Sequence, residues 1–99
     1  MIKKRFFKEK CKVSFEIPKE TQAESVMLVG EFNDWDQSAM PLKRLKSGVW
    51  KTTIDLKKDT TYQFRYLIDG ERWINDRSAD RYVPNHIDGD NSVVVTSVF

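Results

Sequence analysis

The 99-residue chain has little of what builds a disulfide-bonded, metal-binding or membrane protein. Its single cysteine, Cys11, cannot form an internal disulfide, and its single histidine, His86, lies in a polar loop without the spacing of a zinc site. No apolar run approaches the roughly 20 residues that a membrane span needs. The basic N-terminus also lacks the apolar segment of a signal peptide. We therefore expect a cytoplasmic protein with no membrane partner.

The sequence also lacks a catalytic signature. It has no nucleophile motif and no glycine-rich phosphate loop. The carboxylates of Asp76, Asp80, Asp88 and Asp90 would suit glycosidase chemistry or a calcium site. However, they lack the twelve-residue calcium pattern, and turn hydrogen bonds explain them more simply. We expect no catalytic residue, no metal and no cofactor.

Positive charge is concentrated at the N-terminus. Residues 1–12 contain six Lys or Arg and one Glu, whereas the rest of the chain contains eleven basic and fourteen acidic residues. Such a segment either attracts anions such as nucleic acid or phosphate, or is a solvated edge strand whose lysines discourage pairing with other chains. Because the rest is acidic, nucleic acid is not the expected partner. We predict a basic arm or edge strand over residues 1–11 and a single domain over 12–99.

Two-residue alternation of apolar and polar side chains dominates the chain and predicts an all-β protein. Strands are predicted over 13–17, 25–30, 41–45, 49–56, 62–68, 72–74 and 92–99. Turn signals separate them, no segment shows helical periodicity, and residues 75–90 are predicted to be a loop. This spacing is typical of a β-sandwich, here of about seven to eight strands.

Alternation also assigns individual side chains to the core or the surface. Trp50 shares a strand face with Ile54, so we expect it in the core. Phe64 and Tyr66 share another core face, which places Arg65 on the opposite side of that strand.

Two further tryptophans, Trp35 and Trp73, stand beside turn residues. An indole at a turn either folds back into the core or binds something flat, and the residue pattern alone leaves both open. A sugar-binding protein needs indole rings for the C–H faces of the sugar and amide or guanidinium groups for its hydroxyls. Arg65 and Asn91 would supply those polar groups.

Three segments resemble, in order, the glycogen- and starch-binding modules of carbohydrate-binding module family 48. These occur in the β subunit of AMP-activated protein kinase and at the N-terminus of isoamylase and branching enzyme. Residues 30–35, GEFNDW, resemble the G-x-F-N-x-W motif. Residues 62–73 resemble the aromatic strand, D-G turn and following tryptophan, and residues 88–95 the closing strand. The resemblance covers about residues 12–98. It implies an immunoglobulin-like (early set) β-sandwich and non-catalytic binding of α-1,4-linked glucans.

The resemblance also implies site residues. By position, Trp35 and Trp73 match the sugar-stacking tryptophans, and Asn91 matches a hydrogen-bonding asparagine. Arg65 stands where kinase-type modules have a lysine that bonds glucose hydroxyls. The expected partner is an α-glucan polysaccharide or oligosaccharide.

A secondary sugar contact is expected near His86 or Ile87, where kinase-type modules insert a leucine into a bend of the glucan. The family also contains modules that pack against a catalytic domain without measurable sugar binding. The alternative is therefore a protein-interaction domain that partners a glucan-metabolising enzyme.

Overall fold

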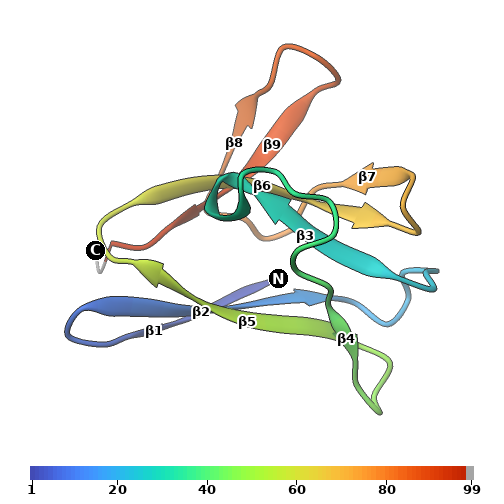
Figure 1. The fold of residues 1–99 in the computed structure, drawn as a ribbon, viewed down its shortest axis with the longest axis horizontal. Helices are drawn as coiled ribbons and strands as arrows, with labels where there is room; N and C mark the ends of the chain where they lie inside the picture. Colours follow the sequence, from blue (N-terminus) through green and yellow to red (C-terminus); the bar gives the residue numbers. More distant parts are fainter. Residues whose placement is uncertain (98–99) are drawn as a thin grey trace.

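The computed structural model describes residues 1–97, and its strands form two antiparallel sheets packed face to face (Figure 1). One sheet has the order β1-β2-β5-β4, and the other has the order β3-β6-β9-β8, with β7 also paired to β6. The elements are β1 (Ile2–Phe6), β2 (Lys10–Ile17), β3 (Val26–Gly30), the 3₁₀ turn η1 (Glu31–Asn33), β4 (Lys43–Arg44), β5 (Trp50–Lys57), β6 (Thr61–Ile68), β7 (Arg72–Ile74), β8 (Arg81–Pro84) and β9 (Asp90–Val95). The fold is the immunoglobulin-like β-sandwich that the sequence predicts.

The core lies between the sheets because alternate residues of each strand face inward. Phe15 of β2 meets Phe64 of β6 edge to face, with ring centroids 5.0 Å apart, and Tyr66 packs beside them. Trp50 is buried in the same core, as predicted. Cys11 is buried there too, and burial raises the pKa of its thiol, so the neighbouring lysines do not activate it.

β6 is the strand on which the second sheet depends, because it has partners along both edges. β3 pairs with one edge at residues 64–68. Along the other edge, β9 pairs at residues 61–64 and β7 at residues 66–68. Arg65 lies where the partner changes. In Figure 1 the β8–β9 hairpin and β7 leave β6 in different directions. Alternation directs Arg65 to the outer face of the sheet, as predicted.

The basic N-terminal segment begins the first sheet. β1 pairs with β2 along its whole length and forms the edge of that sheet. β2 itself begins at Lys10, so it runs across the boundary expected at residues 11–12. Lys4 also reaches the other layer, where its ammonium lies 2.6 Å from the Asp80 carboxylate.

The prediction of a loop over 75–90 is wrong for five residues, because β8 pairs with β9 there and β9 already begins at Asp90. Arg81 and Tyr82 are both exposed, so this edge strand shows no apolar alternation, and Pro84 marks its end. Within residues 1–97 the sandwich thus has nine strands, against the seven to eight expected. β9 ends at Val95, earlier than predicted, and residues 98–99 of that prediction lie outside the described residues. No helix among residues 1–97 is long and apolar enough to cross a membrane.

One carboxylate is buried at the edge of the core. Asp76 is 2% exposed, and its Oδ2 accepts the Tyr66 hydroxyl at 2.6 Å. The N–H of Ser78 donates to Oδ1 at 2.7 Å, and the amino group of Met1 lies 2.7 Å from Oδ2. Burial and the neighbouring Asp76 charge raise the pKa of Tyr66 well above its usual value. Tyr66 therefore keeps its proton and remains a donor to this carboxylate.

Replacing Tyr66 by Phe should lower the free energy of unfolding by about 1.5–3 kcal/mol, because a buried carboxylate loses a charge-assisted hydrogen bond. Tyr62→Phe, on the same face of β6, is the matched control. Among residues 1–97, the Tyr62 hydroxyl accepts one long hydrogen bond, from the backbone N–H of Lys57 at 3.3 Å, so this change should cost less than about 1 kcal/mol. Urea unfolding measures both. Equal losses of unfolding free energy in the two variants would contradict the role of Tyr66 as a hydrogen-bond donor to Asp76.

Candidate functional site

The glycine of the GEFNDW segment, Gly30, allows the end of β3 to approach β6 closely. Gly30 has an extended backbone, and a Cβ on it would lie 2.6 Å from the Gln63 carbonyl oxygen and 2.8 Å from Cβ of Phe64. Only glycine fits this approach. Two residues later, Phe32 folds its ring inward, 5.8 Å from that of Phe15. The segment is thereby anchored to the core before it turns outward.

Asn33 then closes the turn that presents Trp35. Its Oδ1 accepts the Gly30 N–H at 3.1 Å, and its Nδ2 donates to the Leu28 carbonyl at 3.0 Å. Asp34 and Trp35 both have left-handed backbones, with φ of 54° and 58°. The Trp35 N–H donates back to the Gly30 carbonyl at 2.8 Å. The backbone of Trp35 is fixed, while its side chain remains at the surface.

The hairpin from β6 to β7 positions Trp73, as the sequence predicts. Asp69 and Gly70 have positive φ values of 54° and 73°, and the Glu71 N–H donates to the Ile68 carbonyl at 3.1 Å. Two successive residues of positive φ are typical of the turns that match the twist of a hairpin. Glu71 adds one further residue before the strands pair, since Ile68 is opposite Arg72. Because Trp73 pairs with Leu67, which has the same parity as Arg65, its indole lies on the outer face.

Five of the six sequence-predicted site residues line one open depression of about 310 Å³: Trp35, Arg65, Trp73, Ile87 and Asn91. Asn85 and Asp88 complete its lining. Trp35 is 37% exposed, Trp73 is half-buried, and Ile87 is 90% exposed at the tip of the β8–β9 loop. His86 is exposed and is not part of the lining.

The outer face beneath this pocket is apolar. Val29 and Leu67 are almost fully buried, yet both lie outside the core between the sheets. Arg65 pairs with Val29 across β3 and β6, and its side chain is 13% exposed. Its guanidinium carbon lies 5.8 Å from the centre of the Trp73 ring. The pocket therefore combines indole rings with one partly desolvated cation.

Asp88 is the partner of that cation. Both of its carboxylate oxygens lie 2.9 Å from Nη1 of Arg65. Asn85 supports the pair, since its Nδ2 donates to Asp88 at 2.8 Å and its Oδ1 accepts the N–H groups of Ile87 and Asp88. The hydrogen bond from Arg65, followed by that from Asn85, lowers the pKa of Asp88 below its ordinary value.

Asn91 belongs to an amide network. It is 8% exposed, its Nδ2 donates to Oε1 of Gln63 at 3.1 Å, and its Oδ1 accepts from Asn85 at 3.1 Å. An amide has two N–H donors and two acceptor lone pairs. Asn91 therefore keeps one donor and one acceptor for a ligand after both protein bonds are made.

Sequence reasoning missed Asp88, Asn85 and Gln63. It attributed Asp88 to turn chemistry, but Asn85 makes the turn bonds and Asp88 pairs with Arg65. The spacing Asn85-x-x-Asp88 is the signal that would have suggested a tight loop. It would not have identified Arg65, which is 23 residues away in the chain.

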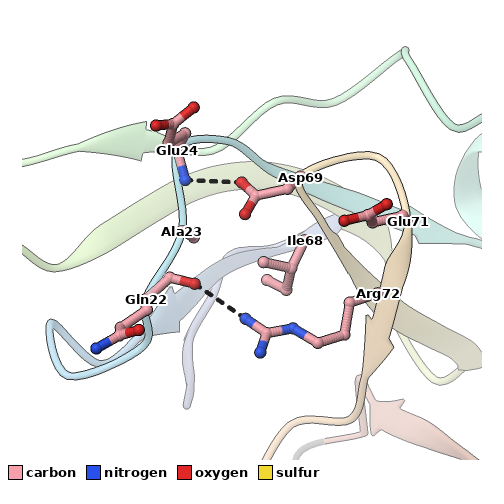
Figure 2. Close-up of a pocket in the computed structure, with 7 residues that line it drawn as sticks. All are labelled: Gln22, Ala23, Glu24, Ile68, Asp69, Glu71 and Arg72. Carbon is pink, nitrogen blue, oxygen red and sulfur yellow. Dashed lines mark hydrogen bonds between the residues drawn. The ribbon is translucent and has the colours of Figure 1, made fainter.

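A second depression, of about 430 Å³, is larger but serves a structural purpose. It is lined by Gln22, Ala23, Glu24, Ile68, Asp69, Glu71 and Arg72 (Figure 2). Figure 2 shows Asp69 accepting the Glu24 N–H and Arg72 donating to the Gln22 carbonyl, at 2.7 and 2.9 Å. These bonds fasten the β6–β7 turn to the segment before β3. Arg72 pairs with Ile68 and so faces away from Trp73.

The four carboxylates considered from the sequence do not form a cluster. Asp76 is buried with Tyr66, Asp80 pairs with Lys4, and Asp88 pairs with Arg65. Within residues 1–97, no group of three or more His, Cys, Asp and Glu side chains is arranged to hold a metal ion.

Comparison with known proteins identifies a family and several curated relatives. The model of carbohydrate-binding module 48, the isoamylase N-terminal domain, matches residues 20–83, which include Trp35, Arg65 and Trp73. The Cruciform DNA-recognizing protein 1 of Saccharomyces cerevisiae, in strains RM11-1a, JAY291 and AWRI796, is 32% identical over 66 residues. That similarity covers 64% of this chain, and the chain spans about 14% of the length of the yeast proteins.

Replacing Arg65 by Gln should raise the pKa of Asp88 toward its ordinary value of 3.8, because the largest cause of the lowered value is removed. Asp36 is the internal control, since bonds from Ser38 lower its pKa and should persist. An NMR pH titration of the carboxyl carbons measures both. Because the folded pKa of Asp88 lies below that of the unfolded chain, the contact stabilises the fold above about pH 3.8 and is lost as pH falls through the folded value. A pKa of Asp88 that does not respond to Arg65→Gln would contradict the pairing.

Proposed function

The chain belongs to the carbohydrate-binding module 48 family, and we propose that it binds α-1,4-linked glucans through the pocket of Trp35 and Trp73. The observation that carries the proposal is the convergence of both indoles with Arg65 and Asn91 on one open depression. Arg65, Trp73 and Asn91 come from three different strands, β6, β7 and β9, whereas Trp35 comes from the connection that follows η1. None of the four belongs to the core between the sheets. The geometry thus assembles a surface site rather than a packing cluster.

The chemistry of the pocket suits a sugar. Indole rings match the C–H faces of glucose units, while the guanidinium and amide groups match the hydroxyls at the rim. Ile87 is almost fully exposed on the β8–β9 loop and lines the same depression, which supports the proposal that it contacts a bend of a glucan chain. His86 does not line this pocket, so Ile87 is the residue of that pair that we propose as the secondary contact.

The proposed role is binding without catalysis. The family is one of non-catalytic binding modules, and three of the four carboxylates considered from the sequence, those of Asp76, Asp80 and Asp88, are engaged in separate contacts. Glycosidase chemistry needs two carboxyl groups on either side of one bond. We therefore propose that the chain recruits glucan polymer, and that a glycogen-metabolising enzyme acting on the same polymer is its functional partner.

The yeast relatives are named for recognising cruciform DNA, but this chain spans only about 14% of their length. Nucleic-acid binding relies on Lys and Arg side chains that neutralise phosphates. In the pocket of this chain, Arg65 is the cation among the lining residues of the described part, and Asp88 already neutralises it. The pocket is therefore better suited to a neutral ligand than to a phosphate backbone.

The affinity for a single oligosaccharide should be weak. If each indole removes about 50 Å² of sugar surface from water, each contributes about 1.3 kcal/mol at ~25 cal/mol per Å². After the loss of translational freedom, we expect a Kd of about 10⁻⁵ to 10⁻³ M. Such a module acts best on a polymer, where neighbouring chains offer many sites at once.

Trp35→Ala and Trp73→Ala should each weaken maltoheptaose binding about tenfold, in proportion to the lost indole contact. Phe7→Ala is the matched control, because Phe7 is 39% exposed, close to the 37% of Trp35, but lies at the β1–β2 turn of the other sheet. Isothermal titration calorimetry measures the affinities, and circular dichroism confirms that each variant folds.

Wild-type protein that binds neither maltoheptaose nor glycogen would contradict the proposal and favour a protein-interaction domain instead. An equal loss of affinity in Phe7→Ala would show that the pocket is not the site.

A further inference from the structure

We propose that Asp88 makes the pocket selective for neutral glucans, because it occupies the guanidinium group that would otherwise bind anionic sugars. This inference rests on the proposed glucan-binding function and concerns the class of glucan that the same site accepts. It starts from a feature that the sequence did not reveal, the pairing of Arg65 with Asp88 inside the pocket.

Without Asp88, Arg65 would form an effective anion site. Its side chain is largely buried, at 13% exposure, so its charge is less screened by water than that of a surface arginine. A planar guanidinium matches carboxylate and phosphate groups, and desolvation strengthens such bonds. A phosphorylated or carboxylated polysaccharide would therefore compete with neutral glucan for this position.

Asp88 prevents this by its charge and its fixed position. Both carboxylate oxygens lie 2.9 Å from Nη1 of Arg65. Asn85 holds Asp88 through a bond of 2.8 Å and shapes the loop by accepting the N–H groups of Ile87 and Asp88. The carboxylate is therefore part of the pocket lining, although its side chain is about half exposed to solvent.

The pair still leaves groups that a hydroxyl can use. Asp88 contacts Nη1 alone, and among residues 1–97 no protein atom accepts a hydrogen bond from Nη2 of Arg65. A sugar hydroxyl both donates and accepts, so it can accept from Nη2 and donate to an Asp88 oxygen. A phosphate offers only acceptors and carries the same sign of charge as Asp88, so it gains one contact and is repelled by the other. Neutral hydroxyls are favoured for this reason.

The test compares β-cyclodextrin with β-cyclodextrin phosphate as ligands of wild-type protein and Asp88→Asn. Titration at low ionic strength, where charge effects are largest, measures the four affinities. Wild type should bind the neutral ring at least tenfold more tightly than the phosphorylated one. Asp88→Asn should weaken the neutral ring a few-fold and strengthen the phosphorylated ring at least tenfold.

The matched control is Asp90→Asn, which removes the same charge two residues away. Asp90 is exposed and does not line the pocket, so this variant should keep the wild-type ratio of affinities. An Asp90→Asn ratio that changes as much as that of Asp88→Asn would show an effect of net charge alone and overturn the inference.

Failure of the two proposals gives different results. If wild type binds β-cyclodextrin but Asp88→Asn leaves the ratio unchanged, only the selectivity inference is overturned. If wild type binds the phosphorylated ring as tightly as the neutral one, the inference is also overturned while glucan binding stands. If wild type binds neither ring, glucan binding itself is overturned and the selectivity inference falls with it.

Discussion

The two-residue alternation of β6 is the constraint on which the rest of the structure depends. Phe64 and Tyr66 face the other sheet and form the centre of the core, whereas Arg65 between them faces outward. The same strand therefore supplies the main packing of the sandwich and the polar centre of the proposed site. A shift of β6 by one residue would bury the guanidinium between the sheets and expose the aromatic rings. The core thus fixes the register that places Arg65 in the pocket.

A second constraint is the division of one β6 edge between β9 and β7. If either strand paired along the whole edge, the other strand could not bring a side chain next to Arg65. Instead, the two partners separate there, and each brings one side chain to the opening: Asn91 from β9 and Trp73 from β7. Trp35 arrives from the far edge, on a turn that Gly30 and Asn33 fasten to the sheet. The pocket is a consequence of how this sheet is assembled.

Local patterns explain which parts could be predicted from the sequence. Alternation identified the core faces of β5 and β6, and the Asp69-Gly70 pair identified the hairpin, because both signals involve residues close together in the chain. β8 was not predicted, because an exposed edge strand needs no apolar alternation. The Arg65–Asp88 pair was not predicted either. It depends on how the β8–β9 loop returns to β6, and local residue spacing gives no information on such a long-range arrangement. Composition alone also could not tell whether Trp35 and Trp73 lie in the core or at a site.

The most direct measurement of the central claim is the NMR signal of each indole N–H during titration with maltoheptaose. The chain contains three tryptophans, so Trp50, buried in the core, serves as an internal reference. If the pocket binds glucan, the signals of Trp35 and Trp73 will shift together and saturate at one Kd, while that of Trp50 will stay in place. Binding without any shift of Trp35 and Trp73, or no binding at all, would contradict the account.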